Sequence, residues 1–339
     1  MSRMDDELEA ARFRIYALQD GAIRAQALAH ALTIGIFDRL ERAPMTRAEI
    51  EAEFGLAARV APAFLAFLAS NGLIELGADG AFRNTRAAAT FLVRASPRYV
   101  GGRGLLFQGF YEAIGHLPES LASGRAWTPE GQHDMFAGFT AEQQRWFADG
   151  MFANAVHGGR SLAEVVDFSR FKRMLDVGGN AGGYAIGLAR ANPRLRVTIF
   201  DLEPVRALAL ERIAAAGLAD RIGFVAGSFF DDELPAGHDA LLLSSILHDW
   251  DDEDCARILG RCYRAIEPGG TIIVAEPMLS EDATGPDHPA ASGLTMALLG
   301  GENRTRKRIA EMLVEAGFGG VWMSELLPQN SVVTAIREG

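Results

Sequence analysis

The chain has 339 residues, of which 49% are hydrophobic and 23% charged, a balance typical of a globular protein and unlike that of a disordered one. Its 33 Lys and Arg against 44 Asp and Glu give a net charge of −11, which is poorly suited to non-specific binding of DNA or anionic membranes. At roughly 100–200 residues per domain, this length favours two domains, or one large domain with an appendage.

Neither a targeting signal nor metal-site cysteine spacing is found in the sequence. Residues 1–7 are charged and are not followed by the apolar core of a secretory signal. No apolar run approaches the ~20 residues that span a bilayer. The two cysteines, Cys255 and Cys262, lie seven residues apart in a predicted helix, on one side of it but too far apart to form a disulfide. We therefore expect a soluble, cytoplasmic protein in a reducing compartment.

Residues 1–95 are predicted to be mostly helical. One amphipathic stripe is indicated by apolar residues that recur every four positions: Leu28, Leu32, Ile36 and Leu40. A capping-box pattern at 46–49 begins a second helical stretch, and residues 60–68 form a third, strongly apolar one. Residues 73–76 and 81–83 flank a glycine-containing turn and predict a β-hairpin. This order of elements is that of a winged helix.

A winged helix suggests DNA binding as one function. The predicted third helix carries Arg59 but is otherwise lined with Phe, Leu and Ala. A recognition helix needs several exposed polar or basic side chains to reach the edges of the bases. A buried packing or dimerisation role is therefore favoured for this domain.

Residues 96–165 are predicted to be a helical connector that is rich in aromatic side chains. These are Phe107, Phe110, Tyr111, Trp127, Phe136, Phe139, Trp146, Phe147 and Phe152. Aromatic residues at this density pack into a core, or line a pocket for a flat, apolar ligand. Both interpretations can hold for the same segment.

Short apolar strands alternate with helices in residues 166–339. The strands are expected at 173–177, 196–200, 222–225, 240–247 and 271–275, and the helices at 183–191, 204–216 and 252–266. This alternation is typical of a parallel sheet covered by helices on both faces. After a helix at 305–316, strands at 321–326 and 331–336 are joined by a short turn and must be antiparallel. The sequence thus predicts a doubly wound, mostly parallel, seven-stranded α/β sheet.

A glycine-rich loop at 175–183 follows the first strand of this sheet, where open α/β sheets bind their ligands. Asn180 occupies a position that a dinucleotide fingerprint reserves for glycine, and no P-loop ending is present. The Asp176 carboxylate would repel a pyrophosphate. It would attract a ligand that carries a cationic amino group and a sulfonium, as S-adenosylmethionine does.

Asp201 ends the second strand, 25 residues after Asp176. An acid at this place can accept both ribose hydroxyls of an adenosine. The alternative is that it caps the helix that follows, which has Pro204 near its start.

The segment 244–250 ends the fourth strand at the same edge of the sheet. His248 is the histidine best placed for acid–base chemistry, because its ordinary pKa of ~6.5 allows proton transfer near neutrality. The alternative is a structural histidine that hydrogen-bonds to a loop carbonyl. The acidic run at 251–254 is expected to cap the next helix, and it lacks metal-ligand spacing, so no metal is predicted.

These segments together resemble the class I S-adenosylmethionine-dependent O-methyltransferases, of the plant caffeic-acid and bacterial antibiotic-tailoring small-molecule type. The resemblance covers nearly the whole chain and rests on the loop 176–182, Asp201, the tripeptide 248–250, Glu276 and the segment 300–305. It implies a Rossmann-like methyltransferase fold with a winged-helix dimerisation domain and a connector that contributes to the acceptor pocket. It further implies a homodimer in secondary metabolism.

The resemblance also implies roles for individual residues. His248 would be the general base, and Glu276 would orient it. The glycine loop would hold the methionine part of the cofactor, Asp201 the ribose, and Ser228 with Phe229 the adenine. The full cofactor-binding set would be Asp176, Gly178, Gly179, Gly182, Asp201, Leu202, Ser228, Phe229, Ser244 and Trp250. The acceptor would contact Phe147, Met151, Met296 and Asn303.

Some positions depart from the pattern of this family. Asn180 replaces a glycine, and asparagine tolerates left-handed backbone angles best after glycine. Ser228 and Ser244 stand where the plant enzymes have Asp and Lys. Asn303 replaces a second glutamate, with Glu302 one place earlier, which leaves open the group that contacts the catalytic histidine from that side.

The leading hypothesis is methyl transfer from S-adenosylmethionine to a hydroxyl, most simply an aromatic one, of a small molecule, with S-adenosylhomocysteine as the product. Methyl transfer to nitrogen or another atom, or a non-methylating reaction of the same cofactor, is the alternative. A further alternative is a winged-helix regulator that senses a metabolite. No nucleic-acid or membrane partner is expected.

Overall fold

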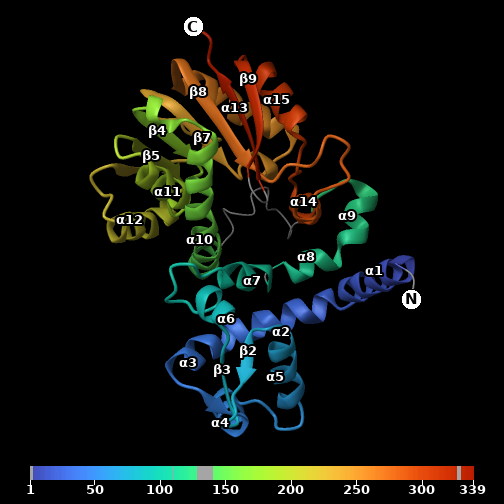
Figure 1. The fold of residues 1–339 in the computed structure, drawn as a ribbon. Coiled ribbons are helices and arrows are strands. Elements are labelled where there is room, and N and C mark those ends of the chain that lie inside the picture. Colours follow the sequence, from blue (N-terminus) through green and yellow to red (C-terminus); the bar gives the residue numbers. More distant parts are fainter. Residues whose placement is uncertain (1–2, 109, 128–139, 327–329) are drawn as a thin grey trace. The chain divides into compact units, whose positions relative to one another are not determined.

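The computed structural model describes residues 3–108, 110–127, 140–326 and 330–339, and it divides into two compact units, Met1–Gly109 and Phe110–Gly339 (Figure 1). Phe136 and Phe139 of the aromatic connector lie outside the described residues, as do the side chains of Phe107 and Trp146. None of the helices in the described ranges combines the length and the apolar character that a bilayer crossing requires.

The first unit consists of helices around a small sheet. Its helices are α1 (Arg3–Gln19), α2 (Gly21–Ile34), α3 (Ile36–Arg42), α4 (Arg47–Phe54), α5 (Ala61–Ser70), α6 (Arg86–Phe91) and α7 (Gly101–Gln108). Its strands are β1 (Met45–Thr46), β2 (Ile74–Leu76) and β3 (Ala81–Asn84), in the antiparallel order β1-β3-β2. The predicted hairpin and the winged-helix order of elements are confirmed.

Local signals set the ends of the helices in this unit. The predicted capping box is present at the start of α4, where Thr46 and Glu49 hydrogen-bond to each other's backbone N–H groups. The apolar stripe that begins at Leu28 runs through two helices rather than one, because Gly35 has a left-handed φ of 72° and ends α2. Helix α5 buries Ala61, Leu65 and Leu68 in the core, which agrees with a packing role for its apolar side.

The second unit is an α/β sheet. Its strands are β4 (Arg173–Val177), β5 (Arg196–Asp201), β6 (Ile222–Ala226), β7 (His238–Ser244), β8 (Ile266–Glu276), β9 (Gly319–Leu326) and β10 (Asn330–Ile336). Its α-helices are α8 (Tyr111–Gly115), α9 (Leu117–Ser123), α10 (Ala141–Val165), α11 (Gly183–Ala191), α12 (Arg206–Ala215), α13 (Asp252–Ala265), α14 (Asp287–Leu299) and α15 (Arg306–Glu315). Short 3₁₀ turns occupy Phe168–Arg170, Glu203–Val205 and Leu247–Asp249.

The sheet has the order β6-β5-β4-β7-β8-β10-β9, with β4 to β8 parallel and β10 antiparallel to both of its neighbours. This confirms the predicted fold class. Apolar clusters cover both faces: α10, α11 and α12 pack on one, and α13 and α15 on the other (Figure 1). Cys255 and Cys262, on α13, are buried and free, as their spacing predicts.

The prediction that the fourth strand continues to Leu247 is wrong. Strand β7 ends at Ser244, because Ser245 takes a left-handed φ of 54° and turns the chain into the 3₁₀ turn. The acidic run that follows caps α13 as expected, since the Asp251 side chain accepts a hydrogen bond from the Asp254 backbone N–H.

Helices α10 and α11 approach each other through glycines. A Cβ atom added at Gly187 would lie 2.5 Å from the backbone oxygen of Val156 and 3.1 Å from the Cα of Gly159. Because α11 begins directly after the glycine-rich loop, this contact fixes α10 beside that loop.

We expect Gly187→Ala to destabilise the second unit. Overpacking against backbone costs about 1–3 kcal/mol, which exceeds the roughly 1 kcal/mol that alanine returns in a helix interior. Thermal unfolding followed by circular dichroism measures the effect as a lower midpoint. Gly223→Ala is the matched control, since nothing lies within 4 Å of a Cβ added there. Equal midpoints for the two variants would contradict the tight helix contact.

Candidate active site

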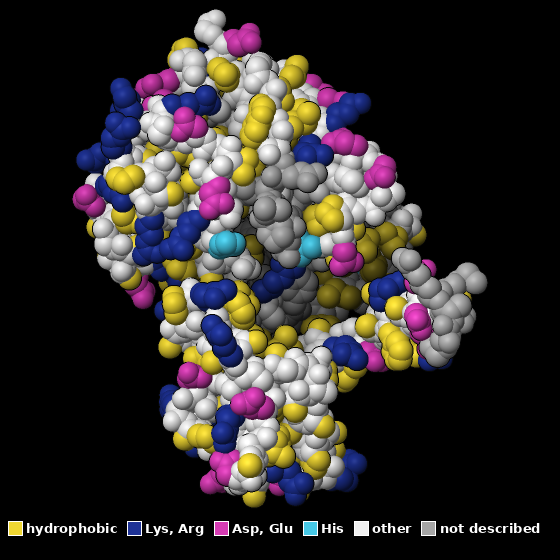
Figure 2. Space-filling model, viewed as in Figure 1, with side chains coloured by type: hydrophobic (Ala, Val, Ile, Leu, Met, Phe, Trp, Pro, Cys, Tyr) yellow, Lys and Arg dark blue, Asp and Glu magenta, His cyan; other side chains and the backbone are white. Residues whose placement is uncertain are grey.

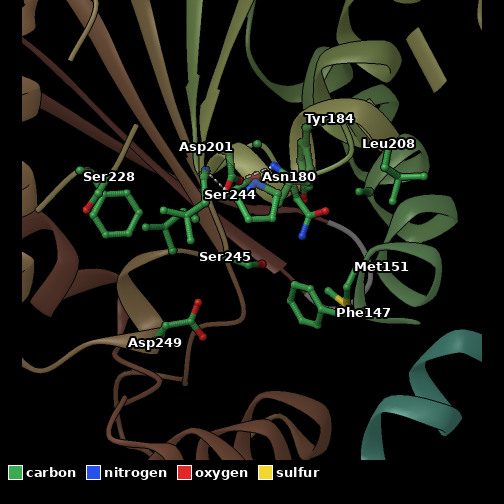
Figure 3. Close-up of a pocket in the computed structure, with 18 of the residues that line it drawn as sticks. Phe147, Met151, Asn180, Tyr184, Asp201, Leu208, Ser228, Ser244, Ser245 and Asp249 are labelled. Carbon is green, nitrogen blue, oxygen red and sulfur yellow. Dashed lines mark hydrogen bonds between the residues drawn. The ribbon is translucent and has the colours of Figure 1, made fainter. Parts of the chain in front are cut away.

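A pocket of about 390 Å³ lies in the second unit, where the parallel strands end (Figure 3). Its walls come from the segments after β4, β5, β6 and β7 and from one side of α10 and α12. Many of the residues predicted from the sequence line it: Phe147, Met151, Gly178, Gly179, Asp201, Leu202, Ser228, Phe229, Ser244 and Trp250. The other predicted residues are not part of the described wall: Asp176, Gly182, His248, Glu276, Met296 and Asn303.

The glycine-rich loop brings bare backbone to the pocket. Gly178 has a left-handed φ of 70°, and a Cβ added there would lie 2.3 Å from Ile246 Cδ1. Asn180 has a φ of 48°, and its side-chain oxygen accepts a hydrogen bond of 2.6 Å from the Ala181 N–H. The loop ends at Gly182, with a φ of 80°, where α11 begins. Asparagine is thus compatible with the left-handed backbone at position 180, where the pattern that the sequence resembles has a glycine.

Asp201 lies at the tip of β5 and faces the pocket. Its two carboxylate oxygens accept hydrogen bonds of 2.7 Å each, one from the Asn180 N–H and one from the Leu202 N–H (Figure 3). Burial raises its pKa to about 6, and these two backbone donors oppose the rise. Because each carboxylate oxygen can accept more than one hydrogen bond, Asp201 retains capacity for ligand hydroxyls.

Asp176 lies in the interior behind the glycine loop. Its side chain is fully buried, and a Cβ added at Gly179 would lie 2.7 Å from the Asp176 carboxylate. Neither of its carboxylate oxygens makes a geometrically good hydrogen bond to a described residue. Burial and the nearby charge of Asp201 raise its pKa to about 7. A buried carboxylate in this state is stabilised by a positive charge placed close to it.

Aromatic rings form another part of the wall. The rings of Phe229 and Phe230 both pack edge-to-face against Trp250, with centroids 5.8 and 4.6 Å away. These residues come from the turn after β6 and from the segment after β7. A flat, apolar group can pack against such a surface, whereas a phosphate cannot.

Helices α10 and α12 supply the opposite wall, with Phe147 and Met151 on α10 and Leu208 on α12 (Figure 3). Arg212 of α12 joins the two helices: its guanidinium pairs with Asp149 and lies 4.0 Å from the centre of the Phe152 ring. This side of the pocket is mainly apolar.

His248 lies on the 3₁₀ turn whose neighbouring residues line the pocket. Its side chain is only 12% exposed, and its Nε2 lies 3.5 Å from the Asp249 carboxylate. Burial lowers the pKa of His248 to about 4, against the influence of the Asn303 side chain and the Ser245 backbone, which raise it. The imidazole is therefore neutral at physiological pH, which leaves one ring nitrogen able to accept a proton.

Glu276, at the end of β8, holds the backbone of this turn. One of its carboxylate oxygens accepts a hydrogen bond of 3.1 Å from the Leu247 N–H, and the side chain is fully buried. Burial raises the pKa of Glu276 to about 7, and the Arg304 guanidinium opposes the rise. The contact of Glu276 that the structure describes is thus with the backbone next to His248.

The segment after α14 packs directly on the turn. The buried Arg304 donates hydrogen bonds of 3.0 Å to the backbone oxygens of Leu247 and Trp250 and pairs with Asp252. A Cβ added at Gly301 would lie 2.1 Å from the His248 backbone oxygen. Tight backbone packing and one guanidinium therefore fix the position of the turn.

The last two predicted residues lie on either side of that glycine. Met296 is half-buried near the end of α14, and its backbone oxygen accepts a hydrogen bond from the Gly301 N–H. Asn303 is buried, and its side-chain amide donates to the Pro289 backbone oxygen at 2.7 Å. Among the described ranges of the chain, no three or more His, Cys, Asp and Glu side chains are grouped as metal ligands.

Sequence reasoning missed several wall residues. They are Arg145, Ala155, Asn180, Tyr184, Pro204, Val205, Ala207, Leu208, Glu211, Gly227, Phe230, Ser245, Ile246 and Asp249. Some had a usable signal, because Tyr184 directly follows the glycine loop and Asp249 follows the predicted base. The wall residues of α12 had no such signal beyond their place after Asp201, since Ala207, Leu208 and Glu211 belong to an ordinary amphipathic helix pattern.

Comparison with known proteins gives two family matches and several similar enzymes. The O-methyltransferase domain model matches residues 133–319, and the O-methyltransferase dimerisation domain model matches residues 16–94. The chain is 37% identical over 306 residues to 3-hydroxy-5-methyl-1-naphthoate 3-O-methyltransferase of Streptomyces sahachiroi. The alignment covers 88% of this chain and 87% of that enzyme. The chain is 29% identical over 320 residues to the N,N-dimethyltransferase OxyT of Streptomyces rimosus, covering 87% of each.

A solved structure extends this similarity to the fold. The crystal structure of human N-acetylserotonin methyltransferase in complex with SAM has a TM-score of 0.89 and 27% identity, and it covers 97% of this chain and 98% of that chain. The family models match more than half of the chain, and the strand order and the pocket at the end of the sheet agree with them. The chain therefore belongs to the S-adenosylmethionine-dependent O-methyltransferases, with a dimerisation domain that precedes the O-methyltransferase domain.

Proposed function

We propose that this enzyme methylates a hydroxyl group of a small aromatic molecule, with His248 as the general base. The single observation that carries the proposal is the common edge of the sheet. There the pocket, its wall residue Asp201, the buried Asp176 behind the glycine loop and the turn that holds His248 lie on adjoining segments. The S. sahachiroi relative is named as a naphthoate O-methyltransferase, which supports an aromatic acceptor.

The residues of the pocket fit S-adenosylmethionine. The carboxylate of Asp201 would accept the ribose hydroxyls, and the Phe229 and Trp250 rings would pack against the adenine. The backbone of the glycine loop would hold the methionine part. The Asp176 carboxylate supports a cationic ligand, since both of its oxygens are buried without a geometrically good hydrogen bond and the Ala185 backbone only partly opposes the rise in its pKa. When bound, the cofactor supplies an electrophilic methyl group on a positively charged sulfur.

The proposed base is weak, so positioning would supply most of the rate acceleration. A phenol with a pKa near ~10 and an imidazole with a pKa of about 4 differ by about six units, or about 8 kcal/mol for complete proton transfer. His248 would therefore accept the proton as the new bond forms, which is typically worth roughly 10²–10⁴-fold. Orienting the two reactants is worth up to about 7–11 kcal/mol.

Phe147 and Met151 of α10 support a contribution of the 96–165 connector to the acceptor site. Glu276 and the Arg304 guanidinium would hold the 3₁₀ turn that carries His248 in place through their hydrogen bonds to the Leu247 backbone. Met296 and Asn303 would lie on the acceptor side of the same turn.

Methyl transfer to nitrogen is the second candidate, because the OxyT relative is named as an N,N-dimethyltransferase. A neutral amine needs less help from a base than a phenol does, since it can lose its proton after the methyl group has moved. The effect of removing the base therefore separates the two candidates.

A labelled-methyl assay against a panel of phenols and aromatic amines tests the proposed function. We expect a labelled aryl methyl ether as the product, and a loss of roughly 10²–10⁴-fold in turnover for His248→Gln, with cofactor binding retained. Mass spectrometry locates the label, and calorimetry measures cofactor binding. Label on nitrogen would support the second candidate, and unchanged turnover in the variant would leave positioning without a base.

We expect the affinity for S-adenosylmethionine to fall as the pH is lowered through the range 7 to 6. The raised pKa values of Asp176, about 7, and Asp201, about 6, mean that both carboxylates gain protons there and lose their attraction for a cation. The uncharged thioether of S-adenosylhomocysteine should make its affinity less sensitive. Calorimetry at several pH values measures both ligands.

Asp176→Asn is expected to make the affinity for S-adenosylmethionine less dependent on pH. Because the titration of the ligand is the same in both experiments, the difference between the native enzyme and the variant reports the Asp176 carboxylate alone. Asp220→Asn is the matched control, because Asp220 is exposed and does not line the pocket. An unchanged pH profile in Asp176→Asn would show that this carboxylate does not sense the cation.

The first unit supports a homodimer. It matches the dimerisation domain model, and it exposes large apolar side chains on α1 and the start of α2 (right side of Figure 2): Leu8, Phe13, Ile15, Leu18 and Ile23. Leu18 is 82% exposed and Ile23 is 68% exposed. Apolar surface of this kind is stabilised by burial against another chain.

Sedimentation should therefore give a dimer for the native chain and a monomer for the double variant Leu18→Asp/Ile23→Asp. A charge at a buried apolar contact costs several kcal/mol, which is enough to separate two subunits. Leu121→Asp is the matched control: Leu121 is 64% exposed on α9 of the second unit. A native monomer, or a double variant that stays dimeric, would contradict the proposed surface.

A further inference from the structure

Two complementary polar atoms beside the active-site turn are buried without a hydrogen-bond partner. They are His248 Nδ1 and the Asn303 side-chain oxygen, and neither makes a geometrically good hydrogen bond to a described residue. An unpaired buried polar atom costs about 1–3 kcal/mol. The two side chains also act on each other, because Asn303 is the strongest influence that raises the pKa of His248.

The orientation of the Asn303 amide is fixed by its other contacts. Its nitrogen donates to the Pro289 backbone oxygen at 2.7 Å and to the Ser292 hydroxyl at 2.6 Å, so both amide hydrogens are used. A backbone oxygen can only accept, so the nitrogen and oxygen of this amide cannot be exchanged. The side chain is 3% exposed, and Gly293 leaves it room, since a Cβ added there would lie 3.3 Å from the Asn303 Cβ.

Charged groups approach the imidazole from other directions. Asp249 faces Nε2 at 3.5 Å, and the Arg304 guanidinium, paired with Asp252, lowers the pKa of His248. Glu276 lies under the turn and hydrogen-bonds to the Leu247 backbone. The Asn303 side chain and the Ser245 backbone are thus the neutral groups among these neighbours. Of the two, the carboxamide oxygen of Asn303 is buried without a partner, and it can fix the proton on the ring without adding a charge.

We propose that Asn303 is a positioning residue, whose side-chain oxygen accepts a hydrogen bond from His248 Nδ1–H. This holds the ring in the tautomer with a free electron pair on Nε2, on the side of Asp249 and the pocket. The inference rests on the proposed role of His248 as the base and refines it. A neutral acceptor selects the tautomer but leaves the imidazole weakly basic, whereas a carboxylate at this position would also raise its basicity.

Nitrogen NMR of histidine-labelled enzyme without cofactor tests the contact directly, with the His248 signals assigned from His248→Gln. We expect the Nδ1-protonated form in the native enzyme and a shift toward the Nε2-protonated form in Asn303→Leu. In Asn303→Glu we expect the Nδ1-protonated form and a pKa of His248 higher by one unit or more. Asn71→Leu, an exposed site in the first unit, is the matched control.

Kinetics give a second readout. Asn303→Leu should lower kcat by about tenfold or more and leave the KM for S-adenosylmethionine unchanged, since part of the base contribution is lost. In Asn303→Glu the acidic limb of the kcat–pH profile should move to higher pH.

An Nε2-protonated His248 in the native enzyme would overturn the proposal without any variant. A native tautomer together with native kcat in Asn303→Leu would also overturn it. If His248→Gln keeps full turnover, the base assignment fails, but the NMR result still decides whether Asn303 holds the ring. Circular dichroism and cofactor affinity identify a variant that has lost its fold. In that case the nitrogen NMR spectrum of the native enzyme decides whether His248 is protonated on Nδ1.

Discussion

The burial of two neighbouring carboxylates is the constraint on which the pocket depends. Asp176 and Asp201 lie on adjacent parallel strands, and the charge of Asp201 adds to burial in raising the pKa of Asp176. The fold satisfies Asp201 with two backbone N–H groups and leaves Asp176 without a comparable partner. The pocket therefore has buried acidic groups at and behind its glycine loop, and this is the physical basis of the proposed preference for a cationic ligand.

The proposed base, His248, is a neutral group, unlike the acidic residues at the glycine-rich loop. The backbone of the His248 turn hydrogen-bonds to the charged side chains of Glu276 and Arg304, so these two residues fix its position, whereas burial keeps the imidazole ring neutral. A strongly basic imidazole would be protonated and would repel a sulfonium nearby. A weak, well-placed base is compatible with the positive charge of the donor, and this agrees with a reaction that gains more from orientation than from proton transfer.

Most of the fold could be predicted from the sequence, and the site only in part. The strand at 173–177 and the helix at 183–191 have the predicted bounds, because the glycine-rich loop separates two mostly apolar segments and marks where one ends and the other begins. The fourth strand was predicted too long, because a left-handed serine at 245 is not visible in an apolar pattern. Asp201 and the glycine loop carry local signals of their chemistry. The packing of Asn303 beside His248 joins residues 55 positions apart, which no local pattern predicts.

The glycine contact between α10 and α11 has a consequence for how such enzymes diverge. Helix α10 carries Arg145, Phe147, Met151 and Ala155 on its pocket side, and its backbone packs closely against the helix that follows the glycine-rich loop. Main-chain atoms thus hold this wall of the pocket beside the glycine-rich loop, and replacing a pocket-facing side chain does not change that contact. Side chains on the pocket side of α10 can therefore change while the backbone of that helix keeps its position beside the loop.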